Sequence, residues 1–407
     1  MIETAFKDLT EAPGDDATLS QVQADDSAYV MHTYGRLPVC FVRGAGLTLW
    51  DTDGKEYLDF LGGIAVNALG HCHPRVVAAI QEQAATLVHT SNLYLTIPQA
   101  RLARKLSEIS GFERAFFCNS GAEANEAALK IARKAGKAGG SEKTGIITLT
   151  HSFHGRTMAT VTATAQAKYQ DPFRPLLPGV TYVERNDLDA LRLAVSEKTC
   201  AIMIEPIQGE CGVYPLTVEF LQAARAIADE HGALLIFDEI QCGMGRTGNW
   251  WAFEGYGVLP DIITTAKALG GGLPIGACLA RGRAAETLVP GDHGSTFGAN
   301  PVATAAAYAT ISAIEQEGLL QNASDMGAYL SSELRRALGD RITEIRGRGL
   351  MIGVQLAKPN ARNVLLDAME RGLIVNAVGD SILRLLPPYI VNAHQVDRAV
   401  EILEEVI

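Results

Sequence analysis

The hydrophobic and polar positions of the chain change rhythm near residue 70. In residues 36–60, alternating apolar residues between turn sequences such as Asp51-Thr52-Asp53-Gly54 predict short strands joined by turns. Beyond residue 70, short apolar runs alternate with segments of helical spacing. The predicted strands are Ala115–Cys118, Gly145–Thr150, Val180–Val183, Ala201–Glu205, Leu234–Asp238, Ile262–Thr265 and Ile275–Ala280, and the predicted helices cover 71–88, 122–134, 187–195 and 217–230.

This alternation predicts an α/β fold. Nearly continuous apolar strands between helices are typical of a buried parallel sheet with helices on both faces. Right-handed crossovers would bring the carboxyl end of every strand to one edge, where ligands of such sheets bind. The last hundred residues repeat the pattern on a smaller scale, with helices at 302–315 and 323–337 and strands at 350–356 and 382–386. We therefore expect a second, smaller α+β domain.

We expect the chain to consist of an N-terminal arm and two domains. Residues 1–27 are acidic and polar and are expected to form a mobile arm. Residues 28–66 and 297–407 are expected to pack together as the small, discontinuous domain, and residues 67–296 to form the large one. Because the carboxyl ends of its strands carry the polar residues described below, the large domain is expected to hold the ligand.

The composition and net charge of the chain limit the kinds of partner that it could bind. The chain has 407 residues, of which 47% are hydrophobic, enough to bury a large core. Thirty-five basic against 46 acidic side chains give a net charge of −11, which disfavours nucleic acid and anionic membranes as partners. No apolar run reaches the length of a membrane span, about 18 residues or more. Seven cysteines without a CxxC pair argue against a disulfide framework, so we expect a cytoplasmic protein.

Two charged residues end buried strands. Lys267 follows the apolar strand Ile262–Thr265, where desolvation would lower the pKa of the amine and make it nucleophilic. Asp238 ends the run Leu234–Phe237, where a carboxylate could pair with a protonated ring nitrogen. Taken singly, a structural lysine that extends to solvent and an acid that caps the next turn are equally open interpretations.

Other polar residues lie at the same predicted edge. Ser120, Gly121 and Ala122 join a strand to a helix and could form a phosphate-binding helix N-terminus or an ordinary helix cap. Phe153 could stack on a planar cofactor, and Arg156 could bind a carboxylate. Arg384 is charged within an apolar run and needs a partner, either a ligand carboxylate or a buried ion pair.

No metal site is expected. His71-Cys72-His73 places potential ligands next to one another in sequence, but such neighbours do not converge on one ion. His151 and His154 do not have the HExxH spacing of a zinc site.

Together these residues resemble the class III aminotransferases. The resemblance covers about residues 30–405. It rests on Phe237-Asp238-Glu239-Ile240-Gln241, Gly243-Met244-Gly245-Arg246-Thr247-Gly248, Pro260-Asp261, Thr265-Ala266-Lys267 and Gly294-Ser295-Thr296-Phe297-Gly298. It implies the fold of aspartate aminotransferase, which is fold type I of the pyridoxal-phosphate (PLP) enzymes, with a mostly parallel sheet in the large domain.

The resemblance also implies a role for each site residue. Lys267 would bind PLP as a Schiff base and move protons, and Asp238 would pair with the pyridinium nitrogen. Gln241 would lie near the phenolic oxygen and Phe153 on the ring face. Ser120, Gly121 and Ala122 would hold the phosphate together with Thr296 of the other subunit of a homodimer. Arg156 and Ser295 would contact a substrate carboxylate, and Glu210 would be the movable counter-ion of Arg384, which would take the α-carboxylate of 2-oxoglutarate.

Within the family, the segments Gly63–Val66, Gly70–Pro74, His89–Tyr94 and Ser120–Glu126 are similar to those of acetylornithine aminotransferases. This similarity implies transfer of the δ-amine of N-acetyl-L-ornithine to 2-oxoglutarate in arginine biosynthesis. The alternative donors are ornithine, succinyldiaminopimelate, 4-aminobutyrate and a carrier-linked lysine. A PLP-binding protein without activity is the alternative from outside the enzymes, and intact Lys267 and Asp238 argue against it.

Overall fold

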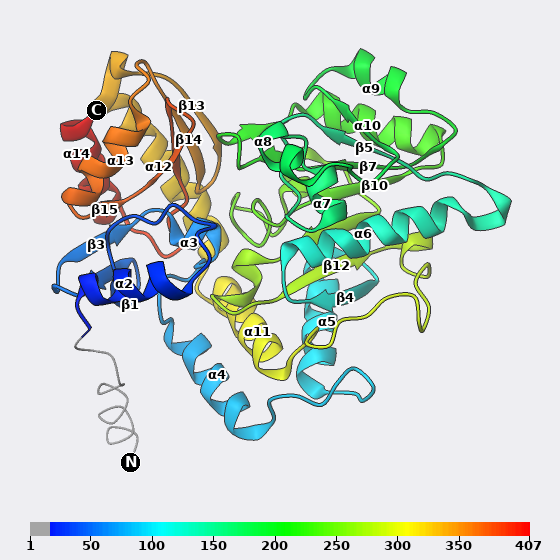
Figure 1. Cartoon of the computed structure of the whole chain (residues 1–407), viewed down its shortest axis with the longest axis horizontal. Coiled ribbons are helices and arrows are strands. Elements are labelled where there is room, and N and C mark those ends of the chain that lie inside the picture. The colour runs from blue at the N-terminus through cyan, green and yellow to red at the C-terminus, as the bar shows by residue number, and fades with distance from the viewer. Residues whose placement is uncertain (1–16) are drawn as a thin grey trace.

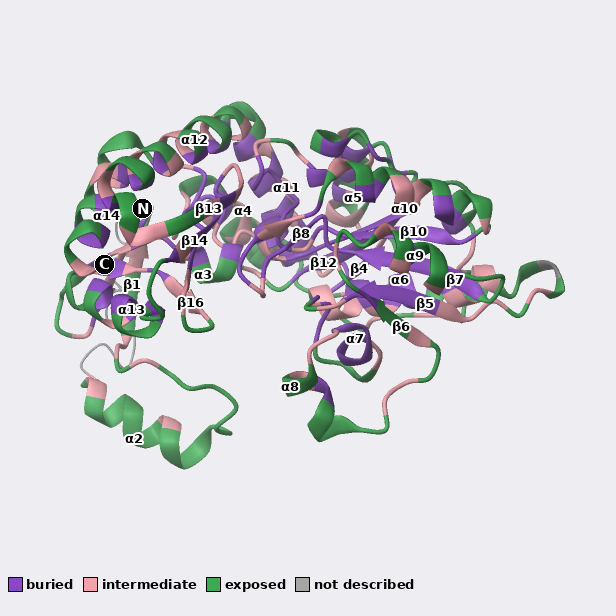
Figure 2. Cartoon of the chain, turned by 90° about the horizontal axis from the view of Figure 1, so that it is seen from above, coloured by how far each residue is buried: buried purple, intermediate pink, exposed green. Residues whose placement is uncertain are grey.

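The computed structural model of the chain describes residues 17–407. The predicted acidic arm therefore lies partly outside the described residues. Its described part contains helix α2 (Leu19–Tyr29), which the hydrophobic pattern did not predict and which has no buried residue. In Figure 2 most of this helix is exposed, and it stands apart from the rest of the chain.

The larger of the two lobes in Figure 1 is built on a seven-stranded sheet. The strand order is β4-β12-β11-β10-β7-β5-β6. The strands are β4 (Arg114–Cys118), β5 (Gly145–Leu149), β6 (Val180–Val183), β7 (Thr199–Ile204), β10 (Leu234–Asp238), β11 (Ile262–Thr265) and β12 (Gly276–Ala280). The predicted α/β class is confirmed, but the expectation that every strand ends at one edge is wrong for β12, which runs antiparallel to β11 and β4.

The strands are apolar on both sides because helices cover both faces of the sheet. Leu234 and Ile236 of β10 pack with the alanine-rich side of α6 (Gly121–Gly136). Leu235 and Phe237, which alternate with them, pack with Phe220 of α10 (Val218–Glu230) on the opposite face. Side chains alternate along a strand, so a sheet covered on both faces needs a continuous apolar run, as the sequence has.

Other helices of this lobe surround the sheet and the hairpin β8 (Ile207–Gln208)–β9 (Tyr214–Pro215). They are α4 (Pro74–Thr86), α5 (Ile97–Ser110), α7 (Met158–Ala163), α8 (Ala167–Gln170), α9 (Leu188–Ala194) and the 3₁₀ turns η1 (Ala138–Gly140), η2 (Asp171–Phe173), η3 (Ala252–Tyr256), η4 (Lys267–Gly270) and η5 (Gly282–Ala284). Among the described helices, none is long and apolar enough to cross a bilayer.

The second lobe contains two four-stranded sheets. One joins β1 (Phe41–Ala45), β2 (Thr48–Asp51) and β3 (Glu56–Asp59) to β15 (Leu373–Ile374), and the other has the order β13-β14-β17-β16. The remaining elements are β13 (Ile342–Arg348), β14 (Met351–Leu356), β16 (Asn376–Val378), β17 (Ile382–Leu385), the short α3 (Gly62–Ala65), α12 (Leu319–Leu338), α13 (Ala361–Glu370), α14 (Ala393–Val406) and η6 (Gly339–Arg341). Because β15 pairs with β3, the segment 36–60 packs with the C-terminal elements.

Helix α11 (Pro301–Gln316) lies between the lobes in Figure 1. It contacts α4, α5 and η4 on one side and α12 on the other. The domain boundary expected at residue 297 therefore stays a prediction, because the helix that follows it packs with elements from both sides of that boundary.

Candidate active site

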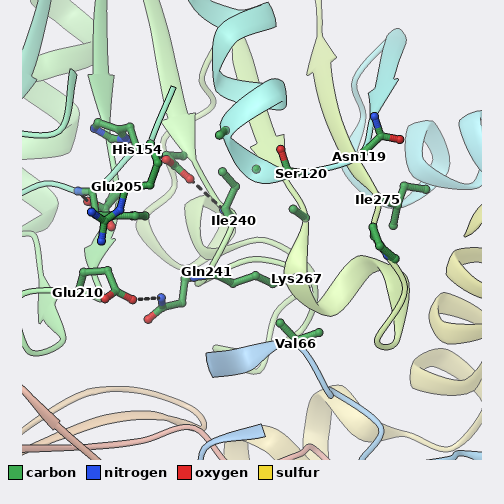
Figure 3. A pocket seen from close by; sticks show the side chains of 18 of the residues that line it. Val66, Asn119, Ser120, His154, Glu205, Glu210, Ile240, Gln241, Lys267 and Ile275 are labelled. Atoms are coloured by element: carbon green, nitrogen blue, oxygen red, sulfur yellow. Dashed lines mark hydrogen bonds and ion pairs between the residues drawn. The ribbon is translucent and has the colours of Figure 1, made fainter. Parts of the chain in front are cut away.

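A cavity of about 400 Å³ opens at the carboxyl ends of the parallel strands. Nine of the predicted site residues line it: Ser120, Gly121, Ala122, Phe153, Arg156, Glu210, Asp238, Gln241 and Lys267. Figure 3 shows Glu210 and Gln241 joined by a hydrogen bond on one side, with Ser120 at the start of α6 away from them. Residues far apart in sequence therefore share one site because their strands end at the same edge.

Lys267 begins η4 directly after β11. Its φ of 41° lies in the left-handed region, which is unusual for a lysine and marks local backbone strain. The surrounding protein desolvates the ammonium group and lowers its pKa, although the nearby carboxylate of Glu210 opposes this shift. A lysine with a lowered pKa is more often present as the neutral, nucleophilic amine.

Asp238 ends β10 and is almost completely buried. Its Oδ2 accepts hydrogen bonds of 2.8 Å from Asn125 Nδ2 and from His154 Nδ1, and its Oδ1 accepts one of 3.1 Å from the Ile240 amide. Three donors satisfy the carboxylate and fix its orientation toward the cavity.

His154 and Glu205 surround this carboxylate with further buried titratable groups. Burial acts to lower the pKa of His154, but the hydrogen bond and charge of Asp238 outweigh it and raise the pKa. Burial raises the pKa of Glu205 to about 8, with His154 acting against the rise and Asp238 adding to it. Glu205 accepts a 2.8 Å hydrogen bond from the Phe153 amide, which fixes the start of the segment that carries Phe153 and Arg156.

Helix α6 begins at the cavity wall. The Ser120 hydroxyl caps the helix by accepting a hydrogen bond from the Glu123 amide. At Gly121 a Cβ atom would lie 2.7 Å from Ile240 Cδ1, so this position has no room for a side chain. The free amides at the start of this 16-residue helix form a site suited to an anion.

Arg384 lies beneath the cavity, on β17, and does not line it directly. Its Nη1 donates a 2.7 Å hydrogen bond to Glu210 Oε1, and Asn376 Oδ1 accepts from its Nε and Nη2. Burial acts to raise the pKa of Glu210, but the charges of Arg384 and Lys267 outweigh it and lower the pKa to about 2. Gln241 Nε2 donates to the same Glu210 oxygen at 3.2 Å. The structure shows the buried ion pair, whose carboxylate lines the cavity, and the binding of a ligand carboxylate by Arg384 stays a prediction.

Ser295 and Thr296 do not line this cavity. Ser295 Oγ accepts a 3.0 Å hydrogen bond from Asn119 Nδ2, which places it near the start of α6. Thr296 is exposed on the surface. The cavity of this chain thus brings together nine of the twelve predicted residues, and Arg384, Ser295 and Thr296 lie outside its lining.

Asn125, His154 and Glu205 were given no role at the site from the sequence. Asn125 is the clearest of the three, because a fully buried amide stands on the apolar side of α6, between Ala124 and Ala128. Besides Asp238, it donates to the His154 carbonyl and accepts from the Thr264 hydroxyl. A polar residue within an otherwise apolar helix stripe was the available signal.

The described residues 17–407 contain no group of three or more His, Cys, Asp or Glu side chains placed to hold a metal ion. In the segment 71–73, where potential metal ligands follow one another in sequence, His71 Nε2 lies 2.8 Å from Asp59 Oδ2, and His73 Nε2 lies 3.4 Å from Glu317 Oε2. The two imidazoles therefore point to different carboxylates.

Comparison with known proteins shows to which family the chain belongs. The sequence profile of the class-III aminotransferases matches residues 29–407. The chain belongs to this family. It is 51% identical to the acetylornithine aminotransferase of Methanocaldococcus jannaschii, over 94% of this chain and 96% of the relative. It is also 51% identical to that of Gloeobacter violaceus, over 95% of this chain and 97% of the relative.

Solved structures of related aminotransferases have the same architecture. The ornithine aminotransferase of Toxoplasma gondii superposes with a TM-score of 0.91 at 33% identity, covering 99% of this chain and 97% of that one. The acetylornithine aminotransferase of Elizabethkingia anophelis superposes with a TM-score of 0.86 at 35% identity, covering 96% and 98%. The chain is therefore a PLP-dependent transaminase with the fold of this family.

The donor set of the cavity fits PLP. This aminotransferase offers a lysine with a lowered pKa for an aldehyde, a buried and ionisable carboxylate for a ring nitrogen, and a helix N-terminus for a phosphate. All three groups line the one cavity, so a single ligand can contact them together.

Proposed function

We propose that this aminotransferase transfers the δ-amine of N-acetyl-L-ornithine to 2-oxoglutarate, giving N-acetyl-L-glutamate 5-semialdehyde and L-glutamate in arginine biosynthesis. The observation that carries the proposal is that Arg156, which has no carboxylate partner within residues 17–407, lines the same cavity as Lys267 and Glu210, and that Glu210 is paired with a second arginine, Arg384. The acetylornithine aminotransferases that are about 50% identical over nearly the whole chain support the choice of donor.

In this proposal the cofactor and the protein have separate tasks. Bound PLP supplies an aldehyde that combines with amines and a ring that withdraws electrons from the carbon bearing the nitrogen. Lys267 Nζ holds the cofactor between turnovers and carries the proton that leaves one carbon and returns to another. Because burial lowers the pKa of this amine, it releases a proton more readily than an ordinary lysine.

Asp238 is proposed to pair with the ring nitrogen and keep it protonated. Its carboxylate is suited to this role because Asn125 and His154 orient it and the raised pKa of His154 favours the charged imidazolium beside it. Phe153 would cover one ring face, and Gln241 would lie near the phenolic oxygen. Ser120, Gly121 and Ala122 would bind the phosphate through the N-terminus of α6.

The two arginines are proposed to divide the substrates. N-acetylornithine has one carboxylate, which Arg156 would bind while Glu210 stays on Arg384. A contact of Ser295 with this carboxylate stays a prediction from the sequence, because Ser295 lies outside the cavity lining of its own chain. 2-Oxoglutarate has two, so its α-carboxylate would displace Glu210 and bind Arg384. One pocket would then serve both half-reactions, because the ion pair closes for one substrate and opens for the other.

A cytoplasmic homodimer is proposed as the working form. Exposed apolar side chains gather in one segment, where Leu93, Leu95 and Ile97 are 85%, 102% and 74% exposed. A second copy of the chain would bury such a surface. Thr296 and Phe297 are also exposed, and Thr296 is proposed to reach the phosphate in the partner's cavity. All seven cysteines are free thiols, as is usual in a reducing compartment.

A panel of donors tests the proposed substrate. Initial rates with 2-oxoglutarate as acceptor would be measured for N-acetylornithine, ornithine, succinyldiaminopimelate, 4-aminobutyrate and lysine on a carrier. We expect the highest kcat/KM for N-acetylornithine. Ornithine is the second candidate because the ornithine aminotransferase of Toxoplasma gondii superposes so closely. A higher kcat/KM for ornithine or 4-aminobutyrate would reject N-acetylornithine as the donor.

A further inference from the structure

Arg156 lines the cavity, and its guanidinium makes no ion pair within the described part of the chain. Among residues 17–407, no carboxylate lies within ion-pair distance of its guanidinium, and no hydrogen bond engages its nitrogen atoms. An exposed arginine without partners samples many rotamers, and fixing it on a substrate costs about 2 kcal/mol of conformational entropy. A site that relies on this side chain therefore needs a device that holds it in place.

Two aromatic rings supply the contacts that the side chain does have. The Arg156 Cζ atom lies 3.9 Å from the centroid of the Tyr169 ring and 5.5 Å from that of Phe153. The two rings meet edge to face, with centroids 5.8 Å apart and planes 80° apart. Tyr169 therefore contacts both the residue proposed to stack on the cofactor and the residue proposed to bind the substrate.

A ring face differs from a carboxylate as a partner for arginine. A carboxylate would occupy the N–H groups of the guanidinium, whereas a stacked ring leaves all five of them free to donate. The aromatic contact thus restrains the guanidinium and leaves its hydrogen-bonding edge available to an incoming anion.

Tyr169 itself is held by its neighbour in α8. Gln170 is buried, and its Nε2 donates to the carbonyls of Thr162 and Thr164 at 3.0 and 2.8 Å and to the Tyr182 hydroxyl at 3.0 Å. These bonds fix the one-turn helix against the end of α7. The ring of Tyr169 is therefore presented by a rigid backbone.

We propose that Tyr169 is a positioning residue that sets the preference for amine donors bearing a carboxylate. It acts through Arg156, whose guanidinium it holds ready for that carboxylate. The inference rests on the proposed function, because it takes Arg156 as the contact of the donor carboxylate. Tyr169 itself contacts neither the carboxylate nor the reacting amine in this scheme.

The test compares two donors that differ only in the carboxylate, N-acetylornithine and N-acetyl-1,4-diaminobutane. In the PLP-loaded Tyr169→Leu enzyme, KM for N-acetylornithine should rise roughly 2- to 30-fold, the range that a cation–π contact of about 0.5–2 kcal/mol supplies. Its kcat, and both constants for N-acetyl-1,4-diaminobutane, should stay within about twofold of wild type. Tyr169→Phe keeps the ring face and should restore the wild-type KM.

A double-mutant cycle shows whether Tyr169 acts through Arg156. In an Arg156→Gln background, Tyr169→Leu should add no further rise in KM. The visible absorbance of bound cofactor should match wild type, which separates this role from a disturbance of Phe153. Should Tyr169→Leu not fold, Tyr169→Met, which also removes the ring face, takes its place in the cycle with the same expected rise in KM and the same lack of effect in the Arg156→Gln background.

The outcomes separate the two proposals. A wild-type enzyme that does not prefer N-acetylornithine over N-acetyl-1,4-diaminobutane would reject the proposed donor, and with it the basis of the inference. A wild-type preference that survives intact in Tyr169→Leu, or a loss of equal size for both donors, would reject only the role of Tyr169.

Discussion

Arg384 Nη1 and Glu210 Oε1 lie 2.7 Å apart, so the guanidinium proposed to bind a substrate already holds a carboxylate of the protein. The other acceptors of Arg384 are the side-chain oxygens of Asn376 and Gln241 and the Gly209 carbonyl, which are all neutral, so the carboxylate of Glu210 is the partner that a substrate carboxylate would replace. The lowered pKa of Glu210 keeps this partner charged across the neutral range.

Glu210→Ala should favour glutamate over the ω-amine donor. Without the ion pair, a substrate α-carboxylate binds Arg384 without first displacing Glu210, so kcat/KM for glutamate should rise and that for N-acetylornithine should fall. We expect the ratio of the two to shift by roughly tenfold, or about 1.4 kcal/mol. Steady-state kinetics of both half-reactions measure it. Unchanged constants for both donors would argue against the gate.

The raised pKa of Glu205 makes stability depend on pH. Between its ordinary pKa of 4.5 and the folded value of about 8, the folded protein holds a proton that the unfolded chain has released. The contribution of this group to stability therefore falls as pH rises through that window and levels off above it. Glu205→Gln cannot ionise, so its melting temperature relative to wild type should rise steadily from pH 5 to pH 8.

Glu210 gives the opposite control. Its folded pKa of about 2 lies below the ordinary value, so its contribution is present above pH 4.5 and is lost as pH falls toward 2. Glu210→Gln should therefore lower the melting temperature at neutral pH and have less effect in acid. A pH-independent difference between Glu205→Gln and wild type would contradict the assignment of a buried proton to Glu205.

Lys267→Ala should bind PLP without covalent attachment. The phosphate and ring contacts remain, but the amine is gone, so turnover should fall by roughly 10³-fold or more. Borohydride reduction followed by peptide mass spectrometry should find the cofactor on Lys267 in wild type and on no peptide of the variant. Labelling of a different lysine would contradict the role of Lys267.

Mixed dimers test whether Thr296 serves the partner's cavity. If it does, a dimer of one Lys267→Ala subunit and one Thr296→Ala subunit has both defects in one site and an intact second site. Random mixing should then restore roughly a quarter of wild-type activity at a PLP concentration too low to load Thr296→Ala alone. If Thr296 serves its own chain, the mixture should be no more active than its parents combined.

Asn125→Ala should destabilise the buried network around Asp238. It removes donors to Asp238 and to the His154 carbonyl and the acceptor of Thr264, so we expect a loss of roughly 2–4 kcal/mol. Thr264→Val removes one of these bonds and should cost about 1–2 kcal/mol. Urea unfolding of the cofactor-loaded proteins measures both. Equal losses in the two variants would show that the bond to Asp238 contributes little.

Much of the large sheet was predictable because its strands are buried on both faces. The apolar runs of β10 and β11 mark their strands, and the charged residue that ends or follows each run marks the cavity edge. The direction of β12 was not predictable, since an apolar run is equally compatible with a parallel and an antiparallel strand. Strand β13 mixes three charged residues with a threonine, a glycine and two isoleucines, and its pairing with β14 decides its structure.

The candidate site also has residues that could be predicted from the sequence and residues that could not. Lys267 and Asp238 stand out locally, as charges at the ends of apolar runs. The role of Asn125 depends on a contact with a residue distant in sequence, the bond to Asp238 over 113 positions. No local pattern specifies such a contact, because it exists only once the sheet has brought the strand ends together.

The pairing of β15 with β3 also has a consequence for synthesis of the chain. Lys55, beside β3, donates to the Glu370 carbonyl 315 positions later, and β3 has no parallel neighbour until Leu373 is available. During translation, strand β3 therefore has an unpaired edge until the whole seven-stranded sheet has been synthesised. An unpaired edge is a template for wrong pairing between nascent chains, so this is the point at which a chaperone would have most to protect.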